Sequence, residues 1–95
     1  MKDYEAIFIT KAALADEDSK KLLSQIESEI TKLEGKVENV EKWGKKRIAY
    51  PIKKNKEGIY YKLDFKMEPA MALALSKVYK LNEEILRVTI IRKGK

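Results

Sequence analysis

Apolar and polar residues alternate strictly from Ile59 to Met67, and this pattern constrains the fold more than any other in the chain. A period of two indicates a β-strand with one buried face. Residues 36–52 also favour extended backbone, and a turn is predicted at Asn55–Gly58. The two strands are therefore expected to form an antiparallel hairpin. A bulge is expected near Trp43–Gly44, because the apolar positions on either side of it do not share one alternation.

Two segments have the spacing of amphipathic helices. The first begins near Asp16, where Asp16-Glu17-Asp18-Ser19 supplies capping oxygens and negative charge, and Gly35 is expected to end it in a left-handed conformation. Pro69 fits the first position of the second helix. The expected core-facing residues are Leu22, Leu23, Ile26, Ile30 and Leu33 in the first helix and Ala72, Leu75, Val78 and Tyr79 in the second.

Strands are also predicted over residues 3–10 and 84–93. The resulting order, strand-helix-strand-strand-helix-strand over a single domain of residues 1–95, predicts an α+β fold. Right-handed crossovers in this order produce a ferredoxin-like split βαβ sandwich (βαββαβ), a four-stranded antiparallel sheet with both helices on one face. We expect the first and third strands at its centre.

The alternation also predicts which side chains face the helices. The longer apolar residues are assigned to that side: Tyr4, Phe8, Ile48, Tyr61, Leu63, Phe65, Val88 and Ile90. The opposite, open face then carries mostly polar residues, as expected for a solvated sheet. Its predicted exceptions are Ile7, Ile9, Ala49, Tyr60 and Ile91, which we interpret as an apolar docking patch for a partner protein, rimmed by Arg47, Lys62 and Arg87. Scattered surface isoleucines with no function are the alternative.

Positive charge is concentrated in the middle of the chain. Residues 1–34 hold five basic and eight acidic side chains, whereas residues 35–66 hold ten and four. The segment Gly44–Gly58 contains one acid, Glu57. A strand between two basic clusters suits a polyanion, since each neutralised phosphate releases a counterion. A basic edge that discourages aggregation is the alternative.

Other classes of function find little support in the composition. The chain has no His and no Cys, so common nucleophile–base pairs are missing, and hydration or helix capping accounts for the close carboxylates at Asp3/Glu5 and Glu83-Glu84. We therefore expect no catalysis, metal, cofactor or small-molecule substrate. No apolar run reaches the roughly 20 residues needed to span a bilayer, and the N-terminus lacks a signal-peptide core, so a cytoplasmic protein with no membrane contact is expected.

The segment Gly44-Lys45-Lys46-Arg47-Ile48-Ala49-Tyr50-Pro51-Ile52-Lys53 resembles the bacterial small-subunit ribosomal protein six family. The family pattern is a glycine, a basic pair, a leucine, then Ala/Ser-Tyr-x-Ile; Ile48 replaces the leucine here. Tyr4-Glu5, Val37–Glu41 and Arg87-Val88 extend the likeness over nearly the whole chain. Members often carry a further acidic or flexible C-terminal tail, and because the sequence ends at Lys95 we expect no such function here.

The resemblance implies a structural component of the small ribosomal subunit in the cytoplasm. It would bind the central domain of 16S ribosomal RNA and form a heterodimer with small-subunit ribosomal protein eighteen through the open face. Phosphate and sugar contacts are expected mainly from Lys2, Lys45, Lys46, Arg47, Arg87, Arg92 and Lys93, with Lys53, Lys54 and Lys56 as weaker candidates.

Three other interpretations remain at this point. An RNA-recognition-motif module shares the topology but presents aromatic residues on its open face, where only Tyr60 is expected. A small ferredoxin-like enzyme and a metabolite-binding regulatory domain are the others. Stacking of Tyr60 or Trp43 on a base competes with ordinary packing against sheet neighbours.

Overall fold

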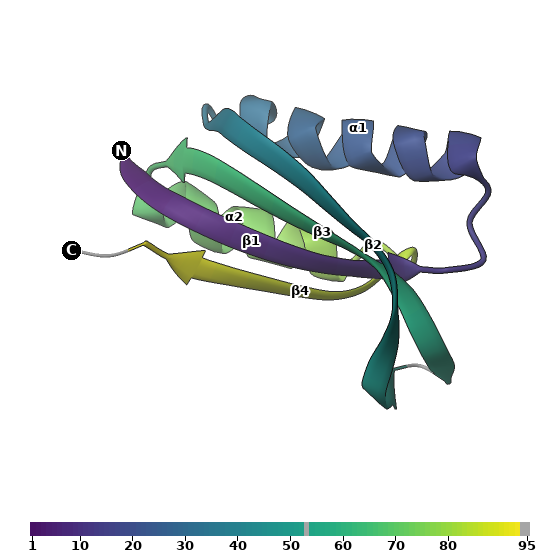
Figure 1. Cartoon of the computed structure of the whole chain (residues 1–95). Helices are drawn as coiled ribbons and strands as arrows, with labels where there is room; N and C mark the ends of the chain where they lie inside the picture. Colours follow the sequence, from purple (N-terminus) through teal and green to yellow (C-terminus); the bar gives the residue numbers. More distant parts are fainter. Residues whose placement is uncertain (53, 94–95) are drawn as a thin grey trace.

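A computed structural model describes residues 1–52 and 54–93 of the chain. The strands and helices form a four-stranded sheet in the order β2-β3-β1-β4, with both helices on one face (Figure 1). All strand pairs are antiparallel, and β1 and β3 are central, so the predicted split βαβ sandwich is confirmed. The elements are β1 (Lys2–Lys11), α1 (Asp16–Lys32), β2 (Lys36–Ile52), β3 (Asn55–Met67), α2 (Pro69–Lys80) and β4 (Ile85–Arg92).

The main core lies between the sheet and the helices. Phe8 of β1 and Phe65 of β3 are 0% and 1% exposed, which confirms their predicted helix-side placement. The ring of Phe8 meets Tyr79 of α2 edge to face, with centroids 4.9 Å apart. The Tyr79 hydroxyl donates a hydrogen bond to the carbonyl of Ile26 in α1, so one side chain joins sheet, α1 and α2. Val78, predicted to face the core, is instead 37% exposed.

The ends of α1 differ from the prediction. No side chain caps its N-terminus, where Ala15 occupies the cap position, although Asp16, Glu17 and Asp18 remain in the first turn. At the C-terminus the left-handed residue is Glu34, with φ of 63°, and not Gly35. The Gly35 amide donates to the Ile30 carbonyl and the Glu34 amide to Thr31, the pattern of a Schellman motif.

The hairpin between β2 and β3 is longer than predicted. β3 begins at Asn55, so the predicted turn at Asn55–Gly58 is wrong, and Lys54 has the positive φ of 68° at the actual turn. The hairpin end projects beyond the helical layer (Figure 1). We call this projection, residues 45–52 and 54–58, the arm. Lys53 lies outside the described residues.

The predicted bulge at Trp43–Gly44 is confirmed. The register of β2 against β3 shifts between Lys42 and Gly44, and Gly44 has φ of 90°. The shift reverses the alternation beyond it, because an inserted residue moves later side chains to the other face. Lys46 is therefore paired with Gly58, and its side chain is on the open face. The side chain of Ile48 is on the same face and lies close to Gly58.

This reversal corrects three predictions about the second strand. Ile48 is not under the helices but packs on the open-face side against Ile9 and Leu86. Arg47 and Ala49, which alternate with Ile48, are exposed and point away from Ile9.

Within the described residues, neither helix is both long and apolar enough to cross a membrane.

Candidate nucleic-acid and protein interface on the open face

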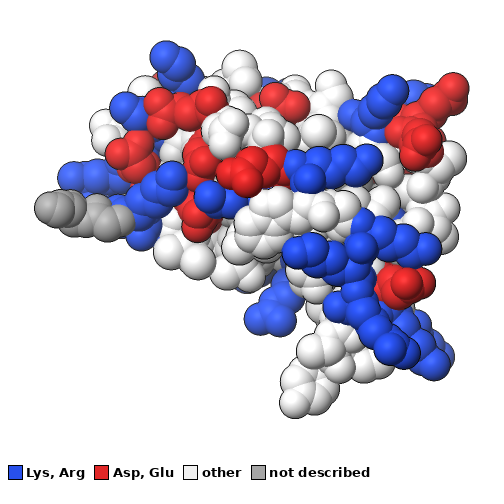
Figure 2. All heavy atoms as spheres, in the orientation of Figure 1, with Lys and Arg blue, Asp and Glu red and all other residues white. Residues whose placement is uncertain are grey.

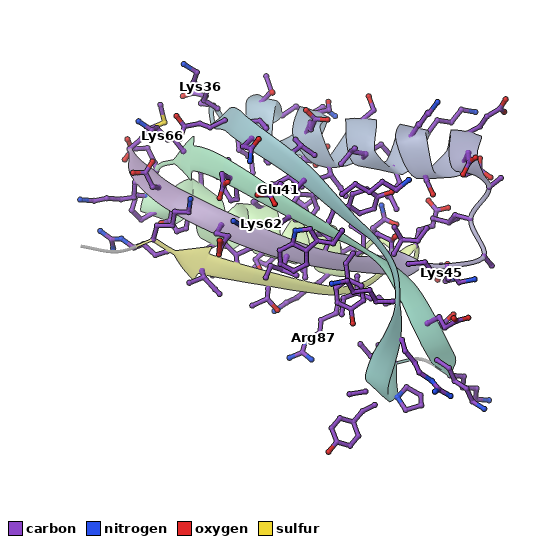
Figure 3. The ribbon with its side chains drawn as sticks, viewed as in Figure 1. Lys36, Glu41, Lys45, Lys62, Lys66 and Arg87 are labelled. Atoms are coloured by element: carbon purple, nitrogen blue, oxygen red, sulfur yellow. The ribbon has the colours of Figure 1, made fainter. Side chains whose placement is uncertain are left out.

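One half of the open face is covered by ion pairs between neighbouring strands. Lys62 of β3 lies 3.1 Å from Glu5 and 3.6 Å from Glu41, between the two neighbouring strands (Figure 3). Lys66 repeats this arrangement with Asp3 and Glu38, each at 3.9 Å. We call this region the paired half; its members are Asp3, Glu5, Glu38, Glu41, Lys62, Asp64, Lys66 and Lys93.

The fifth ion pair in this half joins Lys93 and Asp64 at 2.8 Å. The hydrogen bond from Lys93 lowers the pKa of the Asp64 carboxyl below its usual value, while the pKa of Lys93 is raised by the same bond. The hydrogen bond to Glu5 likewise raises the pKa of Lys62. These pKa shifts favour the charged forms of Lys62, Asp64 and Lys93 at neutral pH. With five carboxylates and three ammonium groups, the paired half does not attract a polyanion.

The arm has the opposite electrostatic character. Its described residues carry five basic side chains and one carboxylate, and that carboxylate, Glu57, lies 3.7 Å from Lys45. Figure 2 shows the contrast: blue side chains gather over the arm, whereas red and blue alternate over the rest of this face. The five basic residues are exposed: Lys45, Lys46, Arg47, Lys54 and Lys56.

A second, smaller apolar cluster fixes the arm to the sheet. Ile9, Ile48 and Leu86 are 8%, 8% and 6% exposed, with Ile52 and Tyr60 packed against them. Leu86 reaches the open face because the register of β1 against β4 shifts between Ile9 and Thr10, so Leu86 and Arg87 both lie near Ile9. Gly58 permits the close approach, since a Cβ there would lie 2.5 Å from the Cγ2 of Ile9.

The predicted apolar patch is smaller than expected. Ile9 is on the open face as predicted, but Ile48 covers it, so it is buried and not exposed. Ala49 follows Ile48 in the strand, so its side chain is on the other side of the arm. Ile7 and Tyr60 are half-buried and Ile91 is 48% exposed, and these three remain accessible.

The predicted RNA-binding residues divide into two groups. Lys45, Lys46 and Arg47 lie on the arm, and Arg87 lies opposite Ile9 at the same end of the sheet (Figure 3). Lys2, Arg92 and Lys93 lie at the other end. Along β3, Lys2 is about 30 Å from Lys46, and along β4, Arg92 is about 17 Å from Arg87. The ammonium of Lys93 is already engaged by Asp64.

The structure also brings together three residues of β2 and β3 whose proximity was not predicted from the sequence. The Lys46 ammonium is 5.2 Å from the centroid of the Trp43 ring and 6.0 Å from that of Tyr60. The indole N–H of Trp43 donates to Glu41 at 3.3 Å. Gly44 was the feature of the sequence from which this grouping could have been predicted. A bulge at that glycine moves the side chains of the following strand residues to the opposite face.

Comparison with known proteins identifies the family. The model of the family Ribosomal protein S6 matches residues 3–92. The chain belongs to the ribosomal protein S6 family. It is 40% identical to the small ribosomal subunit protein bS6 of Desulforamulus reducens over 99% of both chains. It is also 40% identical to that of Helicobacter acinonychis over 97% of this chain, but spans only 65% of that longer relative.

A solved structure supports the same assignment. The crystal structure of 30S ribosomal protein S6 from Thermotoga maritima matches with a TM-score of 0.90 and 29% identity, covering 97% of this chain and 87% of that one. Membership of the ribosomal protein S6 family confirms the predicted family, a component of the small ribosomal subunit, and a structural role in place of catalysis. The enzyme interpretation is therefore set aside.

Proposed function

We propose that this member of the ribosomal protein S6 family binds the central domain of 16S ribosomal RNA through its arm. Lys45, Lys46 and Arg47 would contact phosphates and sugars, with Arg87 extending the contact onto β4. The observation that carries the proposal is the separation of charge on the open face, where a basic arm adjoins a half rich in carboxylates. A polyanion would be attracted to the arm and repelled from the paired half.

The same separation ranks the remaining basic residues. Arg92 and Lys2 are exposed but lie at the far end of the sheet, beside the carboxylates of the paired half. Lys93 would have to leave Asp64 to reach a phosphate. These three are weaker candidates than the arm. Phosphate contacts position an RNA without reading its sequence, so specificity would come from RNA shape and the partner protein.

The partner in this proposal is small-subunit ribosomal protein eighteen, docked on the open face beside the arm. Ile7, Tyr60 and Ile91 would supply the apolar contacts, and the ion pairs of the paired half would form a polar rim. Ile9 would contribute only indirectly, by holding the arm through Ile48.

The salt dependence of RNA binding tests the first part. The triple variant Lys45→Ala, Lys46→Ala, Arg47→Ala should bind a central-domain fragment more weakly, with a log–log salt slope lower by about 0.7–0.9 for each lost phosphate contact. The matched control replaces Lys20, Lys21 and Lys77, three exposed lysines of the helical layer, so that both variants have a net charge of +3. An equal loss of RNA affinity and of salt slope in the two triple variants would refute the assignment of the RNA contacts to the arm.

Heterodimer formation tests the second part. Ile91→Asp should prevent pairing with small-subunit ribosomal protein eighteen in size-exclusion chromatography, because a carboxylate would be buried in the apolar contact. Leu73→Asp is the control, since Leu73 is 65% exposed on α2. Normal pairing by Ile91→Asp would place the partner elsewhere.

A further inference from the structure

Two aromatic rings and an ammonium group meet at the base of the arm, on the open face. The rings belong to Trp43 of β2 and Tyr60 of β3, and Lys46 has its Nζ within 5.2 Å and 6.0 Å of their centroids. The exposed ring of Trp43, at 40%, is unusual for so large an apolar side chain in a small domain. We call these three residues the aromatic–lysine site.

Local backbone geometry builds this site. In a regular strand, residues three positions apart lie on opposite faces. The bulge at Gly44 inserts one residue and so places Trp43 and Lys46 on the same face. The hydrogen bond from the Trp43 indole N–H to Glu41 fixes the ring, and Glu41 is itself held 3.6 Å from Lys62. Tyr60 is held by the Ile9–Ile48–Leu86 cluster. The rings are thus supported from two independent sides.

We propose that the aromatic–lysine site binds one unpaired nucleotide of the RNA. The base would stack on the indole of Trp43, and Lys46 would pair with a phosphate of the same nucleotide. This rests on the proposed RNA-binding function and adds a specific contact to it. Aromatic side chains beside a basic groove are how proteins hold unstacked bases, because every base offers a π-face and every nucleotide a phosphate.

The position of Lys46 is compatible with both contacts. At an exposed site the attraction between an ammonium and a ring is weak, so a phosphate can draw Lys46 away from Trp43 and leave that ring face to the base. Arg87, which is exposed and lies opposite Ile9, adds positive charge on the open face at the same end of the sheet. The surroundings of Trp43 are therefore cationic on the arm side, which favours a nucleotide over an apolar protein segment.

Tyr60 belongs both to the proposed partner-protein contacts and to the aromatic–lysine site, but the other two partner contacts lie elsewhere on the sheet. Ile7 and Ile91 are on β1 and β4, whereas Trp43 is on β2, the opposite edge of the sheet. An RNA strand running along the arm would pass Trp43 before reaching that patch. The two ligands can therefore occupy the open face together.

Trp43 is the single tryptophan of the chain, so its fluorescence reports this site directly. Titration with a central-domain RNA fragment should quench the emission, because a stacked base deactivates the excited indole. Trp43→Leu should weaken RNA binding about tenfold while leaving the salt slope unchanged, since a stacked base but no phosphate contact is lost. Trp43→Phe retains a π-face and should recover much of the affinity. Lys46→Gln should lower the salt slope by about 0.7–0.9.

Two results would overturn the proposal. Unchanged emission on RNA binding, with Trp43→Leu binding normally, would show that no base stacks there. The second result would be a change of the Trp43 emission on adding the partner protein without RNA, by quenching or a blue shift, together with a Trp43→Leu variant that weakens only the heterodimer. That result would assign the Trp43 ring to the protein interface. In both cases a reduced salt slope in the arm triple variant would leave the proposed RNA-binding function standing. If the fragment binds neither wild type nor variants, the proposed function itself fails.

Discussion

Ile48 of the arm packs against Ile9 of β1, on the face of the sheet that carries no helix. This contact joins a projecting hairpin to a central strand through a cluster separate from the main core. The basic residues of the arm flank Ile48 in sequence, so the contact also fixes their position relative to Arg87. Rigid placement of a charged hairpin is what a shape-specific RNA contact requires.

Removing the Ile48 side chain should loosen the arm before it unfolds the domain. Ile48→Ala is expected to lower the free energy of unfolding by about 2 kcal/mol. This is at the low end for such truncations, because the cluster of Ile9, Ile48 and Leu86 is small and lies near solvent. Leu63→Ala, in the main core at 0% exposure, should cost more. Urea denaturation measures both changes, and hydrogen exchange should show faster exchange at the arm amides in Ile48→Ala alone. Equal exchange rates at the arm amides of the two variants would contradict the conclusion that the cluster around Ile48 is separate from the main core.

Gly58 should not tolerate a side chain. A Cβ there would lie 2.5 Å from Ile9 Cγ2 and 3.0 Å from the Thr10 carbonyl oxygen, so Gly58→Ala should destabilise the protein by about 1–3 kcal/mol through overpacking. Gly44→Ala is the comparison, because its Cβ would meet nothing within 4 Å and only the positive φ opposes it. Wild-type stability of Gly58→Ala in urea would show that β1 and the arm are further apart.

The C-terminus of α1 offers a stabilising substitution. Glu34 adopts φ of 63°, which is strained for a residue with a Cβ, so Glu34→Gly should stabilise the protein by about 1 kcal/mol. Glu34→Ala removes the same charge but keeps the strain, and should show no such gain. Thermal unfolding compares the three proteins, and equal melting temperatures for the Gly and Ala variants would contradict a left-handed residue 34.

The Lys93–Asp64 pair predicts a loss of stability in acid. The folded state lowers the pKa of Asp64 below its ordinary value of 3.8, so its contribution is fully present above that pH and is lost as the pH falls through the lower, folded value. Asp64→Asn should therefore flatten the dependence of the unfolding free energy on pH below about pH 4. Asp16→Asn, at an exposed position of α1, is the control. An unchanged acid limb in Asp64→Asn would show that the pair contributes nothing.

Periodicity predicted the elements, their order and the helix-side placement of Phe8 and Phe65, because each strand has one buried face over its regular part. The face of Ile48 and Arg47 could not be predicted, since one bulge at Gly44 reverses every later position. The sequence suggested the bulge but not its exact register. The burial of Ile9 depends on a contact with the arm 39 positions further along the chain, which local pattern does not contain.

The basic cluster was found from composition alone, since charge runs are visible in sequence. Its division into an arm group and a distant group required strand pairing, which places Arg87 opposite Ile9 but Arg92 opposite Tyr4. The ion pair between Lys93 and Asp64 similarly joins two residues that are 29 positions apart in the sequence. Charge can be counted from sequence, but which charges are already paired cannot.

Amide chemical-shift mapping of isotope-labelled protein, titrated with a central-domain RNA fragment, would locate the RNA-binding surface residue by residue. If RNA binds the arm, the largest changes should occur at residues 45–48 and 54–58, at Trp43 and at Arg87. The amides of α1 and of the paired half should change little. Changes concentrated on α1, or on the strand segments carrying Lys62 and Lys66, would contradict an RNA-binding arm.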